Sequence, residues 1–333
     1  MRDSGGQGAG RACRGGEAPA GTAGMGGVDA PTPGGRITPA IRTSTTRRRV
    51  QRWSEDSARW TDDVLVTEEP LEIRLRPAGA EEPLRVAVTM RTPGHDFELA
   101  AGFLFTEGIL DHPDQIRAIS YCTDPDVDGQ QQYNIVNVWL QPGVRLDPTR
   151  LQRNFYTSSS CGVCGKASLE AIRVRGACPV ADRAFTVESG VIAGLPDALR
   201  GGQRLFDRTG GLHAAALFDG SGRLLALRED VGRHNATDKL LGHFFLERRI
   251  PLQGTILVVS GRASFEIVQK AVVAGVPVIV AVSAPSSLAC DAAREFGLTL
   301  IGFARGRRFN VYAGADRVRP SRRPEAEPGE GSS

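Results

Sequence analysis

Residues 255–304 read TILVVSGRASFEIVQKAVVAGVPVIVAVSAPSSLACDAAREFGLTLIGFA. The apolar runs in this stretch predict buried strands, and the segments between them have the periodicity of amphipathic helices. The predicted order is strand 255–260, helix 264–274, strand 277–283, helix 286–296 and strand 299–304. Connections this short between alternating elements are typical of βαβ crossovers. The stretch therefore predicts a parallel or mixed sheet covered by helices.

Further elements precede this alternation. Residues 213–219 and 223–228 predict a hairpin around Gly220 and Gly222, and an amphipathic helix is expected at 234–248. Together with the alternation, these elements predict an α/β domain over residues 153–316.

A block from about residue 62 to 150 has a different pattern. Short strand-like runs lie at 64–67, 71–75, 85–90, 116–122 and 133–140. One helix is expected at 96–106, because Phe97, Ala100, Phe103 and Leu104 recur at helical spacing. We therefore expect a smaller α+β domain over residues 61–152.

The two ends of the chain have the composition of disordered segments. Residues 1–35 contain 12 glycines and almost no bulky apolar side chains, so they cannot bury enough surface to offset ordering entropy. We predict a disordered leader over 1–60 and a disordered tail over 317–333. An arginine run at 47–49 could contact nucleic acid, but a solvated leader is the favoured interpretation.

Composition restricts the partners and the compartment. The net charge of +3 indicates no particular partner. The longest apolar runs are much too short to span a bilayer, and the N-terminus lacks the apolar core of a secretory signal. We therefore expect a cytoplasmic protein that binds neither membrane nor nucleic acid.

Two of the six cysteines stand in CxxC spacing. Six cysteines are too few for a disulfide scaffold in 333 residues, and they indicate a reducing compartment. Three serines precede Cys161, and the segment that follows Cys164 and Lys166 favours a helix. The pair is expected at or just before a helix N-terminus, where free N–H groups, the helix dipole and Lys166 would stabilise a thiolate.

Several chemistries compete for this pair. A zinc site needs two further ligands, yet there is no second CxxC and no HxxxH, and no histidine has a glutamate two residues later as zinc deaminases require. Thioredoxin-like exchange needs the pair behind an early strand of a small domain, whereas here it lies mid-chain. Sulfur carriage by an exposed nucleophilic thiolate fits best, with zinc binding, disulfide exchange and a structural pair as alternatives.

Polar turns follow the three predicted parallel strands, at Ser260 to Ser264, Ser283 to Ser287 and Arg305 to Asn310. Carboxyl ends of parallel strands share one edge of a sheet, so these turns would form one rim that helix N-termini also face. Hydroxyls, helix N-termini and four arginines there would suit a phosphate or pyrophosphate. Singly, the turns are better explained by capping from Ser264 or Ser286 or by an exposed basic patch, but three on one rim favour an anion site.

A second polar cluster runs from Arg228 to Lys239. It can cap the helix at 234–248, with Asp230 or Asn235 at its start and with Asp238 and Lys239 exposed to solvent. It can equally contact a cofactor. The sequence supports both interpretations.

Taken together, these motifs closely resemble those of the FdhD family, the formate dehydrogenase accessory sulfurtransferases. The resemblance runs in family order over about residues 62–314 and is carried by residues 90–108, 158–166, 210–216, 229–235, 260–270, 281–287 and 302–312. It implies a homodimer whose larger domain is cytidine-deaminase-like, a three-layer α/β/α sandwich without the deaminase zinc site.

The resemblance also implies a function. Family members accept sulfur from a cysteine desulfurase as a persulfide and pass it to the molybdenum cofactor, bis-molybdopterin guanine dinucleotide, which then enters apo formate dehydrogenase. The persulfide-bearing cysteine matches Cys161, with Cys164 as its neighbour. The cofactor-contacting segment matches Phe303, Ala304, Arg305, Gly306, Arg307 and Arg308. The competing expectation is a non-catalytic molybdenum-cofactor-binding chaperone, in which the CxxC pair only docks partners.

Overall fold

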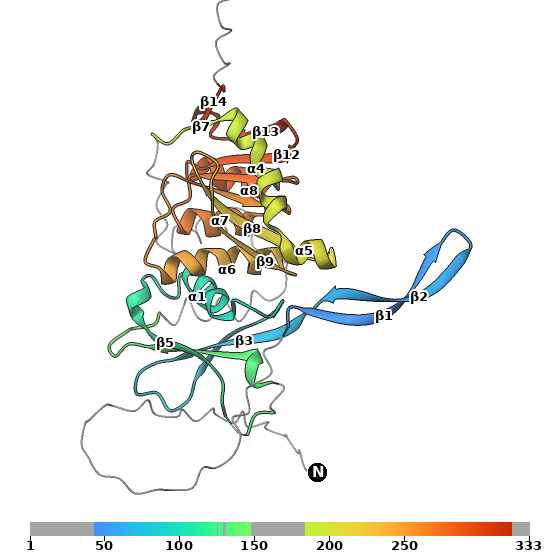
Figure 1. The fold of residues 1–333 in the computed structure, drawn as a ribbon. Coiled ribbons are helices and arrows are strands. Elements are labelled where there is room, and N and C mark those ends of the chain that lie inside the picture. Colours follow the sequence, from blue (N-terminus) through green and yellow to red (C-terminus); the bar gives the residue numbers. More distant parts are fainter. Residues whose placement is uncertain (1–42, 125, 129–130, 148–183, 322–333) are drawn as a thin grey trace, which may run out of the picture.

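The computed structural model describes residues 43–124, 126–128, 131–147 and 184–321. Its largest sheet has six strands in the order β13-β12-β11-β10-β8-β9 (Figure 1). The strands are β8 (His213–Asp219), β9 (Leu224–Asp230), β10 (Thr255–Val259), β11 (Val278–Ala281), β12 (Thr299–Arg305) and β13 (Arg308–Ala313). β10, β11 and β12 are parallel neighbours, and the other pairings are antiparallel. The predicted mixed sheet is confirmed.

Helices cover both faces of this sheet. One face packs against α6 (Arg233–Leu246), α7 (Phe265–Val273) and α8 (Ser287–Glu295), and the other packs against α4 (Ser189–Gly202), which α5 (Arg204–Thr209) follows. Alternate residues of β10 enter different cores: Leu257 faces α6 and α7, whereas Ile256 faces α4. Because both faces are covered, every residue of the strand is buried and Ile256 to Val259 are all apolar. The finer assignment to the cytidine-deaminase-like class stays a prediction.

A smaller sheet carries the N-terminal part of the described chain. Its order is β4-β3-β6-β5, formed by β3 (Glu69–Arg76), β4 (Leu84–Arg91), β5 (Ile116–Tyr121) and β6 (Ile135–Leu140). Helix α1 (Asp96–Thr106) lies between this sheet and α6 (Figure 1). The strands and the helix expected over this region are confirmed.

Helices α1 and α6 touch through their backbones. A Cβ atom added at Gly102 would lie 1.9 Å from the carbonyl oxygen of Asp238, and one added at Gly242 would lie 1.9 Å from the carbonyl oxygen of Glu98. Only glycine fits at such an approach. One hydrophobic core therefore runs from the small sheet through α1 and α6 to the large sheet.

Buried charges tie α1, α6 and α7 together. Lys270 Nζ lies 2.9 Å from Asp238 Oδ1 and 3.2 Å from Glu107 Oε1, and the Thr106 hydroxyl donates to Asp238 over 2.8 Å. Burial raises the pKa of Asp238. Burial opposes protonation of Lys270, but Asp238 and Glu107 outweigh it and raise the pKa of the ammonium group.

The burial of Asp238 and Lys239 contradicts one expectation from the sequence. In the capping interpretation both were exposed to solvent, yet Asp238 and Lys239 are 2% and 1% exposed. Lys239 Nζ lies 2.7 Å from Asp230 Oδ2 and donates to the carbonyl oxygen of Thr92. These charges are buried because each finds a partner on another element, which the helical pattern alone does not reveal.

Both predicted end segments are partly ordered, so their boundaries were wrong. Strands β1 (Thr45–Ser54) and β2 (Ser57–Val66) form an antiparallel hairpin, which projects away from both sheets (Figure 1). At the other end, β14 (Val318–Arg319) pairs with β7 (Val187–Glu188). Residues 1–42 and 322–333 lie outside the described residues.

Candidate anion-binding site at the sheet edge

The turns after β10, β11 and β12 meet as the sequence predicted. The Ser283 N–H donates to the Gly261 carbonyl over 3.4 Å, and the Ser286 N–H donates to the Ala263 carbonyl over 3.0 Å. The Phe303 N–H in turn donates to the Ser283 carbonyl over 3.1 Å. Backbone hydrogen bonds therefore link each turn to the next, and the predicted rim is confirmed.

The serines on this rim differ in what they do. Ser286 caps α8 by accepting from the Ala289 N–H, and Ser260 accepts from the Ala214 N–H. Ser264 is the N-cap residue of α7 but makes no capping hydrogen bond, and its Oγ lies 3.2 Å from His234 Nε2. The capping interpretation therefore holds for Ser286 and not for Ser264.

The basic segment after β12 is the tip of a hairpin rather than a loop. Arg305 and Arg308 are directly opposite each other across β12 and β13, and Gly306 turns the chain with φ +54°. Within the described part of the chain, neither these two arginines nor Arg307 has an ion-pair partner. Like charges directly opposite destabilise a strand pair, so the tip has a positive charge that an anionic ligand would neutralise.

Phe303 adopts an unusual backbone conformation next to this tip. Its φ is +52°, and the residue is 37% exposed. The preceding residue, Gly302, is tightly packed: an added Cβ would lie 2.7 Å from Pro285 Cδ and 3.0 Å from Tyr312 Cε2. This packing restricts the backbone next to Phe303. A bulky residue in the left-handed region is strained, and such strain concentrates at functional sites.

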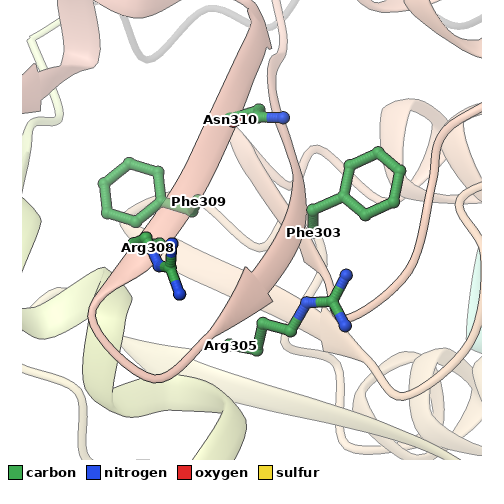
Figure 2. Close-up of a pocket in the computed structure, with 5 residues that line it drawn as sticks. All are labelled: Phe303, Arg305, Arg308, Phe309 and Asn310. Atoms are coloured by element: carbon green, nitrogen blue, oxygen red, sulfur yellow. The ribbon is translucent and has the colours of Figure 1, made fainter.

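Figure 2 shows the hollow that these side chains border. Its volume is about 550 Å³, and it is lined by Phe303, Arg305, Arg308, Phe309 and Asn310. This volume falls within the range of small-molecule sites, roughly 300–1,000 Å³. Ala304, in contrast, is 1% exposed and packs in the core beneath α4, so it can offer a ligand only its backbone.

The carboxyl end of β10 carries further polar side chains that sequence reasoning did not single out as a group. A Cβ at Gly261 would lie 3.2 Å from His213 Nδ1 and 3.9 Å from Arg233 Cδ. The Nε atom of Arg233 is buried without a hydrogen-bond partner in the described part of the chain. Burial, with Arg233 and Arg262 nearby, lowers the pKa of His213.

His234 belongs to the same cluster. Burial first, and then the charges of Lys270 and Arg233, lower its pKa to about 4. Its imidazole is therefore neutral near pH 7. The structure thus divides the ambiguous segment 228–239: Asp230, Asp238 and Lys239 hold the fold together, whereas Arg233 and His234 face the rim.

The cysteine pair lies elsewhere in the chain. Cys161 and Cys164 are outside the described residues. Of the two described cysteines, Cys122 is disulfide-bonded, a pairing the sequence did not predict, and Cys290 is a buried thiol whose pKa burial raises. Neither is an exposed thiolate.

The described part of the chain lacks two further features. It contains no group of three or more His, Cys, Asp or Glu side chains that could hold a metal ion. None of its helices is long and apolar enough to cross a membrane.

The fold and the rim define a mixed α/β protein with a candidate anion site at the edge of its large sheet. The FdhD/NarQ family model matches residues 66–319, and the chain belongs to this family. The sulfur carrier protein FdhD of Streptomyces coelicolor is 56% identical over 275 residues, which cover 82% of this chain and 95% of that protein. The sulfur carrier protein FdhD of Mycobacterium tuberculosis is 50% identical over 279 residues, which cover 83% of this chain and 99% of that protein.

A solved structure shares the fold. A candidate formate dehydrogenase accessory protein from Desulfotalea psychrophila superimposes with a TM-score of 0.62 and 24% sequence identity. The alignment covers 82% of this chain and 99% of that chain. The fold class expected from sequence, mixed α/β, is confirmed at this level.

Proposed function

We propose that this chain is a sulfur carrier of formate dehydrogenase maturation. Cys161 accepts sulfur as a persulfide from a cysteine desulfurase and passes it to bis-molybdopterin guanine dinucleotide, the molybdenum cofactor, before the cofactor enters apo formate dehydrogenase. Membership of the family and the names of the relatives support this function. The single structural observation that carries it is the hairpin tip, where Arg305, Arg308 and Phe303, whose backbone is strained, border one hollow.

The tip suits the nucleotide ends of that cofactor, which is the substrate of the carrier. Guanidinium groups bind phosphate through paired, charge-assisted hydrogen bonds, and Arg305 and Arg308 lie on the two strands that border the hollow. The exposed ring of Phe303 offers an apolar face on which a guanine base can stack. Ala304 and Gly306 contribute by shaping the backbone between these side chains.

Sulfur loading is a thiol exchange. The Cys161 thiolate attacks the outer sulfur of the desulfurase persulfide, the sulfur–sulfur bond of the donor breaks, and the donor cysteine leaves as a thiolate. Cys161 then holds the transferable sulfur, and Cys164, three residues further along the chain, is placed by sequence to relay it or to resolve the persulfide. The carrier works as a homodimer in this proposal.

The test separates loading from binding. Incubation with a desulfurase and cysteine should add about 32 Da to the peptide that contains Cys161, and Cys161→Ser should remove the adduct. Transfer of labelled sulfur from the loaded protein to the cofactor should then follow. A protein that binds the cofactor but never carries the adduct would instead be the non-catalytic chaperone.

Cys164→Ser is the matched control, since it removes a thiol from the same segment. If Cys164 relays or resolves the persulfide, the variant should still load sulfur on Cys161 and should lose only part of the transfer. Loading on Cys164 in the Cys161→Ser variant would contradict the assignment of the persulfide to Cys161.

A further inference from the structure

The carboxyl end of β10 carries a second group of basic side chains. We call His213, Arg233 and Arg262 the β10 cluster. His213 begins β8, the antiparallel neighbour of β10, Arg233 begins α6, and Arg262 lies in the turn after β10. The hollow at the hairpin tip is lined by other residues, which come from β12 and β13 (Figure 2). The cluster is therefore separate from the tip, although both lie on the same rim.

Gly261 is the point at which this cluster converges. A Cβ atom added there would lie 3.2 Å from His213 Nδ1 and 3.9 Å from Arg233 Cδ. Burial first, and then the charges of Arg233 and Arg262, lower the pKa of the His213 imidazole. Both arginines therefore lie close enough to His213 to disfavour a positive charge on its ring.

The positive charge of the cluster is not neutralised within the described part of the chain. Arg233 Nε is buried there without a hydrogen-bond partner, and neither Arg233 nor Arg262 forms an ion pair. A buried polar group that has no partner carries a desolvation penalty, which is larger when the group is charged. An anion bound among these side chains would remove that penalty.

Two carboxylates act electrostatically on the cluster, but each has another partner. Asp230 Oδ2 lies 2.7 Å from Lys239 Nζ, and Glu266 Oε2 lies 3.8 Å from His234 Nε2. Neither carboxylate forms an ion pair with Arg233. A bound anion would supply the charge that these two groups do not.

The N-terminus of α6 adds hydrogen-bond donors beside the same arginine. The helix begins at Arg233, directly after Gly232, and no described side chain caps it. Its first N–H groups and the positive end of its dipole therefore add to the charge of the cluster. Such N–H groups next to guanidinium groups suit a phosphate-like oxyanion.

Backbone hydrogen bonds fix how far the cluster lies from the tip. The Ser283 N–H donates to the Gly261 carbonyl, and the Phe303 N–H donates to the Ser283 carbonyl. Gly261 and Phe303 therefore lie on turns that are two strand spacings apart, about 10 Å. We propose that the β10 cluster is a second oxyanion subsite, which binds a further anionic group of the ligand whose nucleotide end occupies the tip.

The identity of that ligand rests on the proposed function. The two phosphorus atoms of one diphosphate share a bridging oxygen, so one diphosphate is too short to occupy both the tip and the cluster. The ligand must therefore be larger than a nucleoside diphosphate and must be anionic beyond its first diphosphate. Bis-molybdopterin guanine dinucleotide, with two nucleotide ends, belongs to this class.

His213 reports directly on an anion in the cluster. Its ring signals can be followed by nuclear magnetic resonance in the full chain, where His213→Gln identifies them among five histidines. With GDP saturating the tip, inorganic pyrophosphate should shift these signals and raise the pKa of the imidazole, because a nearby anion stabilises its protonated form. A His213 that does not respond, or that responds to GDP and no further to pyrophosphate, would overturn the proposal.

Variants locate the subsite. Arg233→Gln with Arg262→Gln should weaken pyrophosphate binding at least about tenfold, as expected for lost charge-assisted contacts, and should leave GDP affinity unchanged. Arg145→Gln with Arg319→Gln removes the same charge from exposed positions and is the matched control. An equal loss of pyrophosphate affinity in the control would reduce the effect to net charge and refute the subsite.

A single molecule that carries both groups tests whether one ligand spans the two subsites. Diguanosine tetraphosphate should bind at least about tenfold more tightly than GDP, because its second contact is intramolecular. That gain should disappear in the double glutamine variant. Equal affinities in the wild type would mean that the cluster takes a free oxyanion, and the proposal of one spanning ligand would be wrong.

Failure of this subsite is distinguishable from failure of the proposed function. In the variant with alanine at Arg305, Arg307 and Arg308, the response of His213 to pyrophosphate should persist while GDP binding is lost. Loss of the pyrophosphate response in that variant would show that the cluster is not a site of its own. Retained GDP binding there would count against the tip, and persulfide loading at Cys161 tests sulfur carriage separately.

Discussion

The α1–α6 junction and the β12–β13 tip are both rich in charge and both depend on glycine, yet they are built in opposite ways. At the junction, Asp238 and Lys270 are almost fully buried and face each other at 2.9 Å. At the tip, Arg305 and Arg308 face each other in solvent with no counter-ion in the described part of the chain. The first arrangement stabilises the fold, and the second has a charge that only a ligand can neutralise.

The same contrast applies to the backbone. Gly102 and Gly242 permit a close helix contact and introduce no strain, whereas Gly302 supports a neighbour, Phe303, that is strained. Strained residues persist where the surrounding structure over-determines them. The packed core beneath Ala304 therefore maintains the conformation of the tip, and substitutions in the two regions should separate stability from binding.

The largest effect is expected at the helix contact. Alanine at both Gly102 and Gly242 places each new Cβ 1.9 Å from a backbone oxygen, so α1 and α6 must move apart. We expect a loss of at least about 5 kcal/mol in the free energy of unfolding, enough to unfold many domains. Urea denaturation followed by circular dichroism measures it.

Gly194→Ala is the matched control. Gly194 lies in α4, and an added Cβ there meets nothing within 4 Å. Its replacement should raise stability by up to about 1 kcal/mol through helix propensity. If the variant with alanine at both Gly102 and Gly242 were as stable as this control, the backbones of α1 and α6 could not be in the close contact described.

Lys270→Met should have the next largest effect. The change keeps the length of the side chain but leaves Asp238 and Glu107 without their cation, and breaking a buried pair in this way costs about 3 kcal/mol. The remaining loss should depend on pH. With its pKa raised by burial, Asp238 in the variant is neutral at low pH and must ionise, unpaired, as pH rises.

The variant should therefore lose more stability than the wild type as pH increases through the raised pKa of Asp238, because in the wild type Lys270 still stabilises that carboxylate. Arg294→Met removes an exposed pair with Asp291 and should change stability by less than about 1 kcal/mol at any pH. Equal stability loss at pH 5 and pH 8 in Lys270→Met would show that Asp238 is not the group left unpaired.

The contrast also explains what the sequence could predict. Strands such as β10 are apolar on both faces because helices cover both, and this pattern is visible in the sequence. The β1–β2 hairpin is exposed on both faces, so its strands show no alternation and resemble a disordered leader. Helix α4 contains Pro196 and several glycines, which weaken its helical pattern. Packing against the sheet overrides that weakness.

At the site, the sequence could predict the rim but not its details. Parallel strands bring their carboxyl ends together whatever the side chains are, so Ser260, Ser283 and Arg305 could be placed on one edge. Residues 305–310 were predicted as a polar turn, and β13 was missed because its arginine and other polar residues hide the strand pattern. The φ of Phe303 and the roles of Asp238 and Lys239 depend on tertiary contacts that no local pattern records.

Removing the charge of the tip should affect binding and not stability. If Arg305, Arg307 and Arg308 hold the phosphates, each charge-assisted contact contributes about 1.5–3 kcal/mol, and triple alanine substitution should weaken GDP binding by well over tenfold. Stability should be unchanged or slightly higher, because the like-charge pair is gone. Calorimetric titration with GDP measures the first effect and thermal unfolding measures the second.

The triple lysine variant is the control for charge. It keeps three cations but loses the paired geometry of guanidinium, so its affinity should lie between the wild type and the alanine variant. Persulfide loading at Cys161 should survive in all three proteins. Unchanged GDP affinity in a folded alanine variant would remove this tip as the nucleotide site.

The smallest effect, and the most specific, is expected at Phe303. Glycine accepts φ +52° without penalty, whereas phenylalanine at that angle carries strain of roughly 1 kcal/mol. Phe303→Ala removes the ring and keeps a Cβ in the strained conformation, so the difference in stability between Phe303→Gly and Phe303→Ala isolates the strain. We expect the glycine variant to be the more stable of the two by up to about 1 kcal/mol. Both should bind GDP more weakly than the wild type, because both lose the exposed ring that borders the hollow. A glycine variant no more stable than the alanine variant would show that the left-handed conformation costs nothing, and the argument from strain to function at this position would fail.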